Sequence, residues 1–121
     1  MLPPIFPVLK ASMPVAAIIG PNPIRAFRHG HVPQDTVAPY VVWSSINILP
    51  SNNLSDLPSD DRITIEIDCY SYDDTEIVQL ATAVRNAIEP HAHLTGVPVD
   101  LKETETQLYR MSLQFDWFLS R

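Results

Sequence analysis

The sequence predicts an α+β fold, in which a mostly antiparallel sheet of four or five strands packs against one long helix. Apolar and polar residues alternate strictly from Ile63 to Cys69, which is typical of a strand with one buried face. The same alternation runs from Leu108 to Leu119. Between these segments, apolar residues from Ile77 to Ile88 recur at helical spacing. We therefore expect a two-layer sandwich with the long helix on one face of the sheet.

Local signals bound the long helix and indicate shorter elements around it. Asp73 lies three residues before Glu76 and is placed to cap the helix start, while Pro90 ends the helix. The other expected elements are two short N-terminal helices, after Pro3-Pro4 and from Ser12 to Gly20, an edge strand at Ile24–Arg28, a central strand at Tyr40–Ile48 and a strand at Val97–Glu103. The segment Pro50–Asp61 holds three Ser, two Asn and three Asp, and we expect a long mobile loop there. All of these elements belong to a single expected domain, residues 1–121.

Composition restricts the classes of partner. The formal net charge of −6 argues against nucleic acid or an anionic membrane as a partner held by charge attraction. The apolar start of the chain has three prolines by position 7 and then Lys10, which is unlike a secretory signal or a membrane span. The single cysteine, Cys69, falls on the apolar face of a predicted strand, so we expect a buried, unreactive thiol compatible with a reducing cytoplasm.

One face of the predicted sheet is left uncovered by a helix. By alternation, this face carries Arg62, Glu66, Asp68, Arg110, Gln114 and Asp116. Charges of both signs are common on a plain solvated sheet surface. They also suit a self-complementary subunit interface, where opposite charges set the register of the partners. Both interpretations remain open from the residues alone.

Two groups of residues have side chains of the kinds that bind metal ions. Glu66, Asp68 and Asp116 offer three carboxylates for Mg²⁺, as in metal-dependent nucleases, but no lysine lies beside them in the sequence. The pairs His29–His31 and His91–His93 have a spacing found in zinc sites, yet both fall in predicted loops without a cysteine. Neither a glycine-rich phosphate loop nor a nucleophile elbow is present. We expect no catalytic centre and no cofactor.

Five segments follow one another along nearly the whole chain. They are PPIFPVLKAS (3–12), PYVVW (39–43), DRITIEIDCY (61–70), AVRNAIEPHAH (83–93) and LYRMSLQFDWFLSR (108–121). In order and spacing they resemble the tail completion family of long-tailed bacteriophages, the tail terminator or tail-to-head joining proteins. Each motif is structural rather than catalytic, so the resemblance rests on their order.

The resemblance implies a non-enzymatic virion protein, assembled in the bacterial host cytoplasm, with no membrane association. It implies a hexameric ring at the head-proximal end of the tail tube, which stops tube polymerisation and meets the head-neck connector proteins. DNA then passes through the ring without specific binding. A head-completion or stopper protein of the neck is the alternative, and a small metal-dependent nuclease is a third hypothesis.

Two surfaces follow as expected contact sites of such a ring. Contacts between subunits are expected from the uncovered sheet face, through Arg62, Glu66, Asp68, Arg110 and Asp116. Contacts with the tail tube protein or the neck are expected from the long loop, through Asn52, Asn53, Leu54, Asp56 and Asp60. A shift of one residue in strand register exchanges the two faces of the sheet, so the first expectation depends on the observed pairing.

Overall fold

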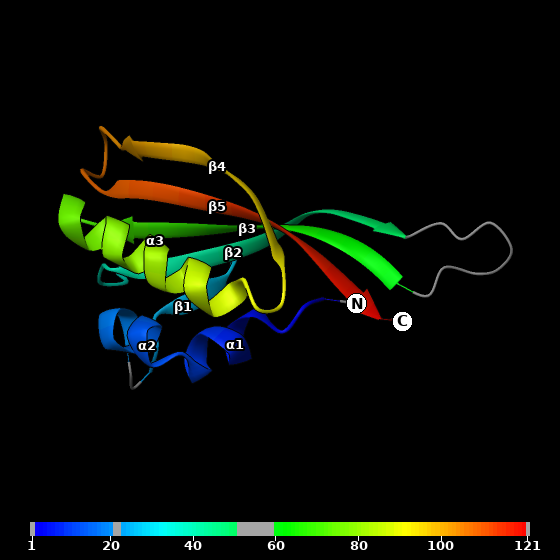
Figure 1. The fold of residues 1–121 in the computed structure, drawn as a ribbon. Helices are drawn as coiled ribbons and strands as arrows, with labels where there is room; N and C mark the ends of the chain where they lie inside the picture. The colour runs from blue at the N-terminus through cyan, green and yellow to red at the C-terminus, as the bar shows by residue number, and fades with distance from the viewer. Residues whose placement is uncertain (1, 21–22, 51–59, 121) are drawn as a thin grey trace, which may run out of the picture.

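The fold has a five-stranded sheet with three helices on one side, in a computed structural model that describes residues 2–20, 23–50 and 60–120 (Figure 1). Its elements are α1 (Ile5–Ala11), α2 (Met13–Ile19), β1 (Ala26–Arg28), β2 (Tyr40–Pro50), β3 (Asp60–Ser71), α3 (Asp74–Ile88), β4 (His93–Lys102) and β5 (Tyr109–Ser120). The strand order is β1-β2-β3-β5-β4, with β1 parallel to β2 and the other neighbours antiparallel. The predicted α+β sandwich with a mostly antiparallel sheet is confirmed.

The core lies between α3 and the middle of the sheet, against β3 and β5. Alternation along the strands produces it, since residues at every second position are buried. The core side chains of these three elements are Ile63, Ile65, Ile67 and Cys69 from β3, Leu113, Phe115 and Trp117 from β5, and Ile77, Leu80, Val84 and Ile88 from α3. Each large one stabilises the fold by roughly 1.5–3 kcal/mol relative to exposure. Among the described residues, no helix has the length and apolar character to cross a membrane.

The two short helices, α1 and α2, pack beside α3 and complete this core. Leu9 of α1 and Val15 and Ile19 of α2 are fully buried, and both helices contact α3. The predicted cap of the second helix is confirmed, because the Ser12 side chain accepts a hydrogen bond from the backbone N–H of Val15 and Gly20 is the C-cap. The N-terminal segment therefore belongs to the same core as the sheet.

The start of α3 is tied to the end of β3. The Asp73 side chain caps the helix as predicted, by accepting from the Thr75 N–H at 3.0 Å. Glu76 does not reach back to Asp73, as it would in a simple capping box; its Oε1 accepts from the buried Ser71 hydroxyl at 2.7 Å. That hydroxyl in turn accepts from the Asp73 N–H at 3.1 Å. Ser71 thus forms hydrogen bonds with both Asp73 and Glu76, and it links the start of the helix to the end of β3.

The two edge strands differ in extent from the prediction. β1 begins at Ala26 rather than Ile24, because Arg25 forms its hydrogen bonds outside the sheet ladder. Its backbone N–H donates to the Ile19 carbonyl, and its Nε donates to the Pro39 carbonyl at 2.8 Å. β4 begins at His93, ahead of the predicted Val97. An edge strand tolerates the proline and the register shifts that β4 contains.

The predicted loop from Pro50 to Asp61 is wrong at both ends. Pro50 is the last residue of β2, and Asp60 and Asp61 belong to β3, opposite Ser120 and Leu119 of β5. Local composition favoured a loop, but β5 runs far enough to supply hydrogen-bonding partners for these polar residues. The other predicted contact residues, Asn52, Asn53, Leu54 and Asp56, lie outside the described residues.

A projecting arm extends from the body of the molecule. It consists of the outer ends of three strands, near Pro50 of β2, Asp60 of β3 and Ser120 of β5, which run beyond α3 (Figure 1). Phe118, near the end of β5, is exposed there. The arm is part of the sheet, so its position relative to the body is fixed by the strand ladders.

Candidate functional site

The face of the sheet opposite α3, here called the polar face, is the candidate functional site. Its side chains alternate with the buried ones of the core, and the observed pairing of β3 with β5 places even-numbered residues of both strands on it. All five charged residues expected on this face lie on it, namely Arg62, Glu66, Asp68, Arg110 and Asp116. Tyr40, Val42 and Ser44 of β2 extend the face on the other side of β3.

The register divides these charged residues into two groups. Asp68 lies opposite Ser112 and close to Arg110, near the body of the molecule. Asp116 lies toward the arm, opposite Thr64, whose hydroxyl donates to its Oδ1 at 2.9 Å. Asp116 is therefore four positions along the ladder from Asp68, and the three carboxylates weighed for Mg²⁺ are not gathered. Within the described residues, no group of three or more His, Cys, Asp and Glu is placed to hold a metal ion.

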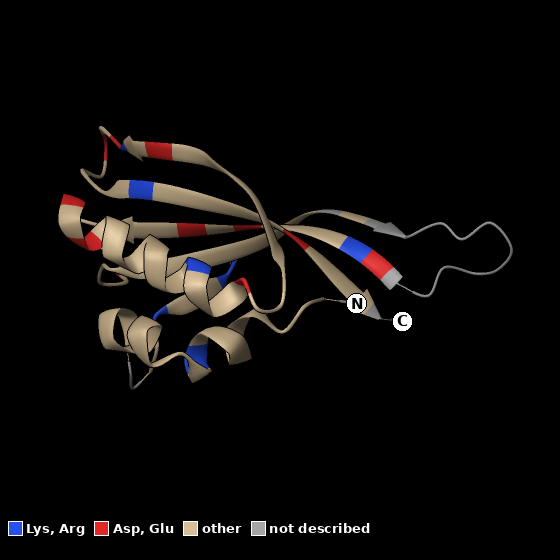
Figure 2. Cartoon of the chain, in the orientation of Figure 1, with Lys and Arg blue, Asp and Glu red and all other residues tan. Residues whose placement is uncertain are grey.

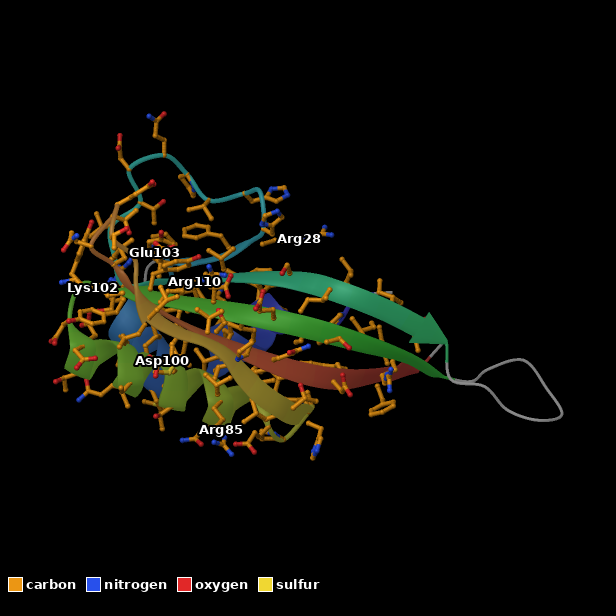
Figure 3. The ribbon with its side chains drawn as sticks, turned by 90° about the horizontal axis from the view of Figure 1, so that it is seen from above. Arg28, Arg85, Asp100, Lys102, Glu103 and Arg110 are labelled. Carbon is orange, nitrogen blue, oxygen red and sulfur yellow. The ribbon has the colours of Figure 1, made fainter. Side chains whose placement is uncertain are left out.

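Asp68 is the centre of the first group. One carboxylate oxygen accepts a short hydrogen bond from the Ser112 hydroxyl, and the other accepts from Nη2 of Arg110 at 3.4 Å. Ser112 is fully buried, while the side chains of Asp68 and Arg110 are 15% and 29% exposed. The Arg110 Nε is buried and has no hydrogen-bond partner among the described residues. In Figure 3, Arg110 lies on the sheet, and the loop that follows β1 is drawn toward the top of the picture.

The electrostatics of this group favour fixed charges rather than proton transfer. Burial and the neighbouring Asp68 carboxylate raise the pKa of Glu66, and Arg110 opposes this. Burial followed by Asp68 raises the pKa of Tyr70 to about 12. Burial lowers the pKa of Arg110, but the pairing with Asp68 outweighs it and the net direction is upward. Arg110 is thus charged at neutral pH beside a phenol that keeps its proton.

Aromatic rings border the ion pair. The rings of Tyr40 and Tyr70 stack across the β2–β3 ladder with centroids 4.9 Å apart. Burial, then the charge of Glu103, raises the pKa of Tyr40, so its hydroxyl is also a donor at neutral pH. Stacked rings beside a fixed ion pair offer a partner apolar area and directional polar groups. These side chains lose little conformational entropy on binding, which suits recognition of a protein surface.

The histidine pairs take different positions in the fold. The His91 ring stacks on Trp117 at a centroid distance of 5.7 Å and an angle of 4° between the planes. His93 opens β4 opposite Asp116, while His29 and His31 follow β1 in a turn. The contact of His91 with Trp117 was not foreseen, since nothing in the sequence pairs residues so far apart. Cys69 is fully buried as predicted, and burial raises the pKa of its thiol.

The family model described as "Tail completion protein gp17" matches residues 3–120. Among solved structures, a chain in the "Virion of native gene transfer agent (GTA) particle" has the same fold, with a TM-score of 0.70 and 15% sequence identity over 97% of this chain and 92% of that chain. Comparison with curated protein sequences finds no match.

The Asp68 cluster is expected to contribute to stability. Asp68→Ala should lower the free energy of unfolding by about 2 kcal/mol, because it leaves the buried Ser112 hydroxyl and the Arg110 guanidinium without their acceptor. Asp100→Ala, at an exposed position of β4, is the control and should change stability by less than about 0.5 kcal/mol. Urea denaturation monitored by tryptophan fluorescence measures both values. Equal changes in the free energy of unfolding for the two substitutions would show that the hydrogen bonds of Asp68 do not stabilise the fold.

Proposed function

Because the chain belongs to the family of tail completion protein gp17, we propose that it caps the head-proximal end of a phage tail tube as a ring. Family and fold make it a structural tail protein of the virion. In this proposal the ring stops tube polymerisation, joins the tail to the neck proteins and performs no catalysis. The observation that supports it most directly is the family match over residues 3–120, which takes in all the elements of the fold.

The sheet edges are poorly suited to joining copies of the chain. The edge strand β1 has three residues, and the other edge strand, β4, contains Pro98 and two register shifts that interrupt a regular ladder. Short strands, prolines and bulges at edges oppose pairing with another sheet. Subunit contacts through a face of the sheet are therefore the better hypothesis.

We assign the ring contacts to the polar face. Arg62 is exposed, and Glu66 and Asp116 are partly exposed, so their charges are available to a neighbour. The paired Asp68 and Arg110 are less exposed and hold the shape of the surface. Opposite charges across a contact set the register of two subunits more than they add affinity. A ring also needs a second, different patch on each subunit, since its contacts are head to tail.

The charge of the chain suits a channel through which DNA passes. A ring of six copies, each at −6, has a formal charge of about −36 at pH 7. Figure 2 shows Lys and Arg dispersed over the helices and strands of the described residues rather than gathered along one face. A wall of this charge repels phosphates, so DNA is not held as it moves.

We assign contact with the tube or the neck to the segment that contains Asn52, Asn53, Leu54, Asp56 and Asp60. The strands that lead into and out of this segment end at the tip of the arm, away from the core (Figure 1). A second protein bound at that tip would not disturb the packing of the core.

The cap itself is tested by assembling tail tubes from tube protein with and without this chain. We expect tubes of limited length with a six-fold ring at one end, visible by negative-stain electron microscopy. Tubes that grow unchecked and uncapped would overturn the proposal. Binding to a purified portal or adaptor complex, with no binding to tubes, would favour a stopper protein of the neck.

The polar face is tested by reversing one exposed charge. Arg62→Glu should reduce the fraction of protein in rings at least about tenfold, because repulsion between like charges at a contact costs more than about 1.4 kcal/mol. Arg85→Glu is the matched control, since Arg85 is equally an exposed arginine but lies on α3, paired with Glu89 at 2.7 Å. Mass photometry of capped tubes and free protein counts the copies. Rings that form normally with Arg62→Glu would exclude this part of the face as a contact.

The tip segment is tested by deleting residues 52–55. The deletion should leave folding and ring formation intact and abolish joining of tails to heads, measured as infective particles from a complementation assay. Replacing the same four residues by Gly and Ser is the control for length, because it keeps the number of residues and removes their side chains. A normal yield of particles from both variants would overturn the assignment.

A further inference from the structure

The basic residues at the start of the chain lie in a region that has no acidic residue. Residues 1–34 contain Lys10, Arg25 and Arg28 and neither Asp nor Glu, whereas residues 35–121 contain all 14 acidic residues and five basic ones. The first region therefore has a formal charge of +3 and the second a formal charge of −9. In Figure 2, α1, α2 and β1 show no red segment. This acidic chain thus keeps one positive region, which suits contact with an acidic surface.

Lys10 and Arg28 are the two cations of this region that have no partner among the described residues. Both side chains are exposed, and neither forms an ion pair, a side-chain hydrogen bond or a ring contact there. Arg25 differs, because its Nε and Nη2 donate to backbone carbonyls at 2.8 and 3.4 Å. The other described cations are Arg85, paired with Glu89, Arg110, paired with Asp68, Lys102, whose Nζ lies 5.3 Å from the Tyr109 ring centroid, and Arg62 on the polar face itself.

These two free cations lie on the helix side of the sheet. Arg28 of β1 is beside Trp43 of β2, and Trp43 is opposite Ile67 of β3, which is fully buried in the core. Side chains in one such row point to the same face, and the Phe6 ring of α1 lies 6.3 Å from the Trp43 ring on that face. Lys10 belongs to α1, which contacts β1. Both cations are therefore on the side opposite the polar face.

The polar face has an unbalanced negative charge beside its stacked tyrosines. Burial, followed by the charge of Glu103, raises the pKa of Tyr40, and Glu103 also contributes to the raised pKa of Tyr70 after burial and Asp68. Glu103 thus lies near both rings, and the Thr106 hydroxyl holds its Oε1 at 2.9 Å. Asp68 is neutralised by Arg110, but Glu103 and Glu66 form no ion pair within the described residues, and both are partly exposed.

This combination of groups favours a guanidinium as ligand. The planar guanidinium of arginine stacks on an aromatic ring and pairs with a carboxylate at the same time. The stacked rings of Tyr40 and Tyr70 supply the aromatic surface, and Glu103 and Glu66 supply the carboxylates. The cation has to come from another molecule, since Arg28 of the same chain lies on the other side of the sheet. In Figure 3, Arg28 lies apart from Glu103 and Arg110.

We propose that Arg28 of one copy binds against the stacked tyrosines and the Glu103 carboxylate of the next copy, with Lys10 adding positive charge to the same contact. Two chains of charge −6 repel each other except where opposite charges meet, and the free cations and the free carboxylates are on opposite sides of one subunit. Such an arrangement joins copies head to tail rather than symmetrically. The inference rests on the proposed function in that copies of the chain assemble, and it supplies the second patch that the polar face requires.

Charge reversal tests the contact. Arg28→Glu should weaken association between copies at least about tenfold, because it brings a further carboxylate toward Glu103 and Glu66. Arg85→Glu changes the net charge equally at an exposed arginine of α3, outside the proposed contact, and should have little effect. Analytical ultracentrifugation measures association, and circular dichroism confirms that the variants fold. Equal weakening by the two substitutions would show general repulsion between copies and overturn the assignment.

A charge exchange tests the pairing of the two residues. Glu103→Arg alone should also weaken association, whereas the double variant Arg28→Glu with Glu103→Arg restores opposite charges and should recover most of the lost affinity. The double variant Arg85→Glu with Glu103→Arg is the control and should stay as weak as Glu103→Arg alone. Recovery in neither double variant, or equal recovery in both, would contradict a contact between Arg28 and Glu103.

Cross-linking locates the contact while leaving both charged residues in place. His29→Cys with Thr104→Cys puts thiols at exposed positions next to Arg28 and Glu103, and a short bis-maleimide should give a ladder of covalent multimers. Asn86→Cys with Thr104→Cys, with the first thiol at an exposed position of α3, should give none. Cys69 does not compete, because it is fully buried. Ladders of equal strength from both pairs, or none from the first, would overturn the proposal.

The outcomes separate this inference from the proposed function. Normal rings on capped tubes from Arg28→Glu would overturn the Arg28 contact and leave the tail-capping role standing. Normal rings that no longer attach to tubes would assign Arg28 to the tube protein and equally overturn the contact between copies. Specific cross-links between copies, in a protein that does not cap tubes, would support the contact and overturn the capping role.

Discussion

The arrangement of every surface in this protein depends on the register of β3. This strand pairs with β2 along one side and with β5 along the other, so its odd and even residues are committed to opposite faces. Its isoleucines form the floor on which α3 packs, and the side chains between them form the polar face. A slip of one residue against β5 would place Asp68 and Glu66 under α3, where burying their charges would cost several kcal/mol each.

The Asp68 cluster therefore has a structural role in holding this register. Its bonds to Ser112 and Arg110 join β3 to β5 and are satisfied in one register. Such a largely buried pair adds little net stability over apolar residues, because desolvation offsets the attraction, but removing one member is costly. A partner that meets this face finds charges already oriented, whereas Arg62 and Phe118 on the arm remain free to adapt.

Periodicity was sufficient to predict the elements and the faces of the sheet, because alternation and helical spacing are local properties of the chain. What it did not predict depends on distant partners. The paired ends at Pro50 and Asp60 depend on how far β5 extends, and the separation of Asp116 from Asp68 depends on the antiparallel ladder. The stacking of His91 on Trp117 has the same origin.

Charge limits how such subunits can meet. Two chains of charge −6 approach each other against repulsion, so a stable contact needs apolar area or paired charges at its centre. On the polar face the charges of Asp68 and Arg110 are already paired, whereas those of Arg62, Glu66 and Asp116 are available to a neighbour. In the proposed ring the contacts are head to tail, so each subunit needs a second patch that differs from the polar face, and growth ends only when rotation closes the ring.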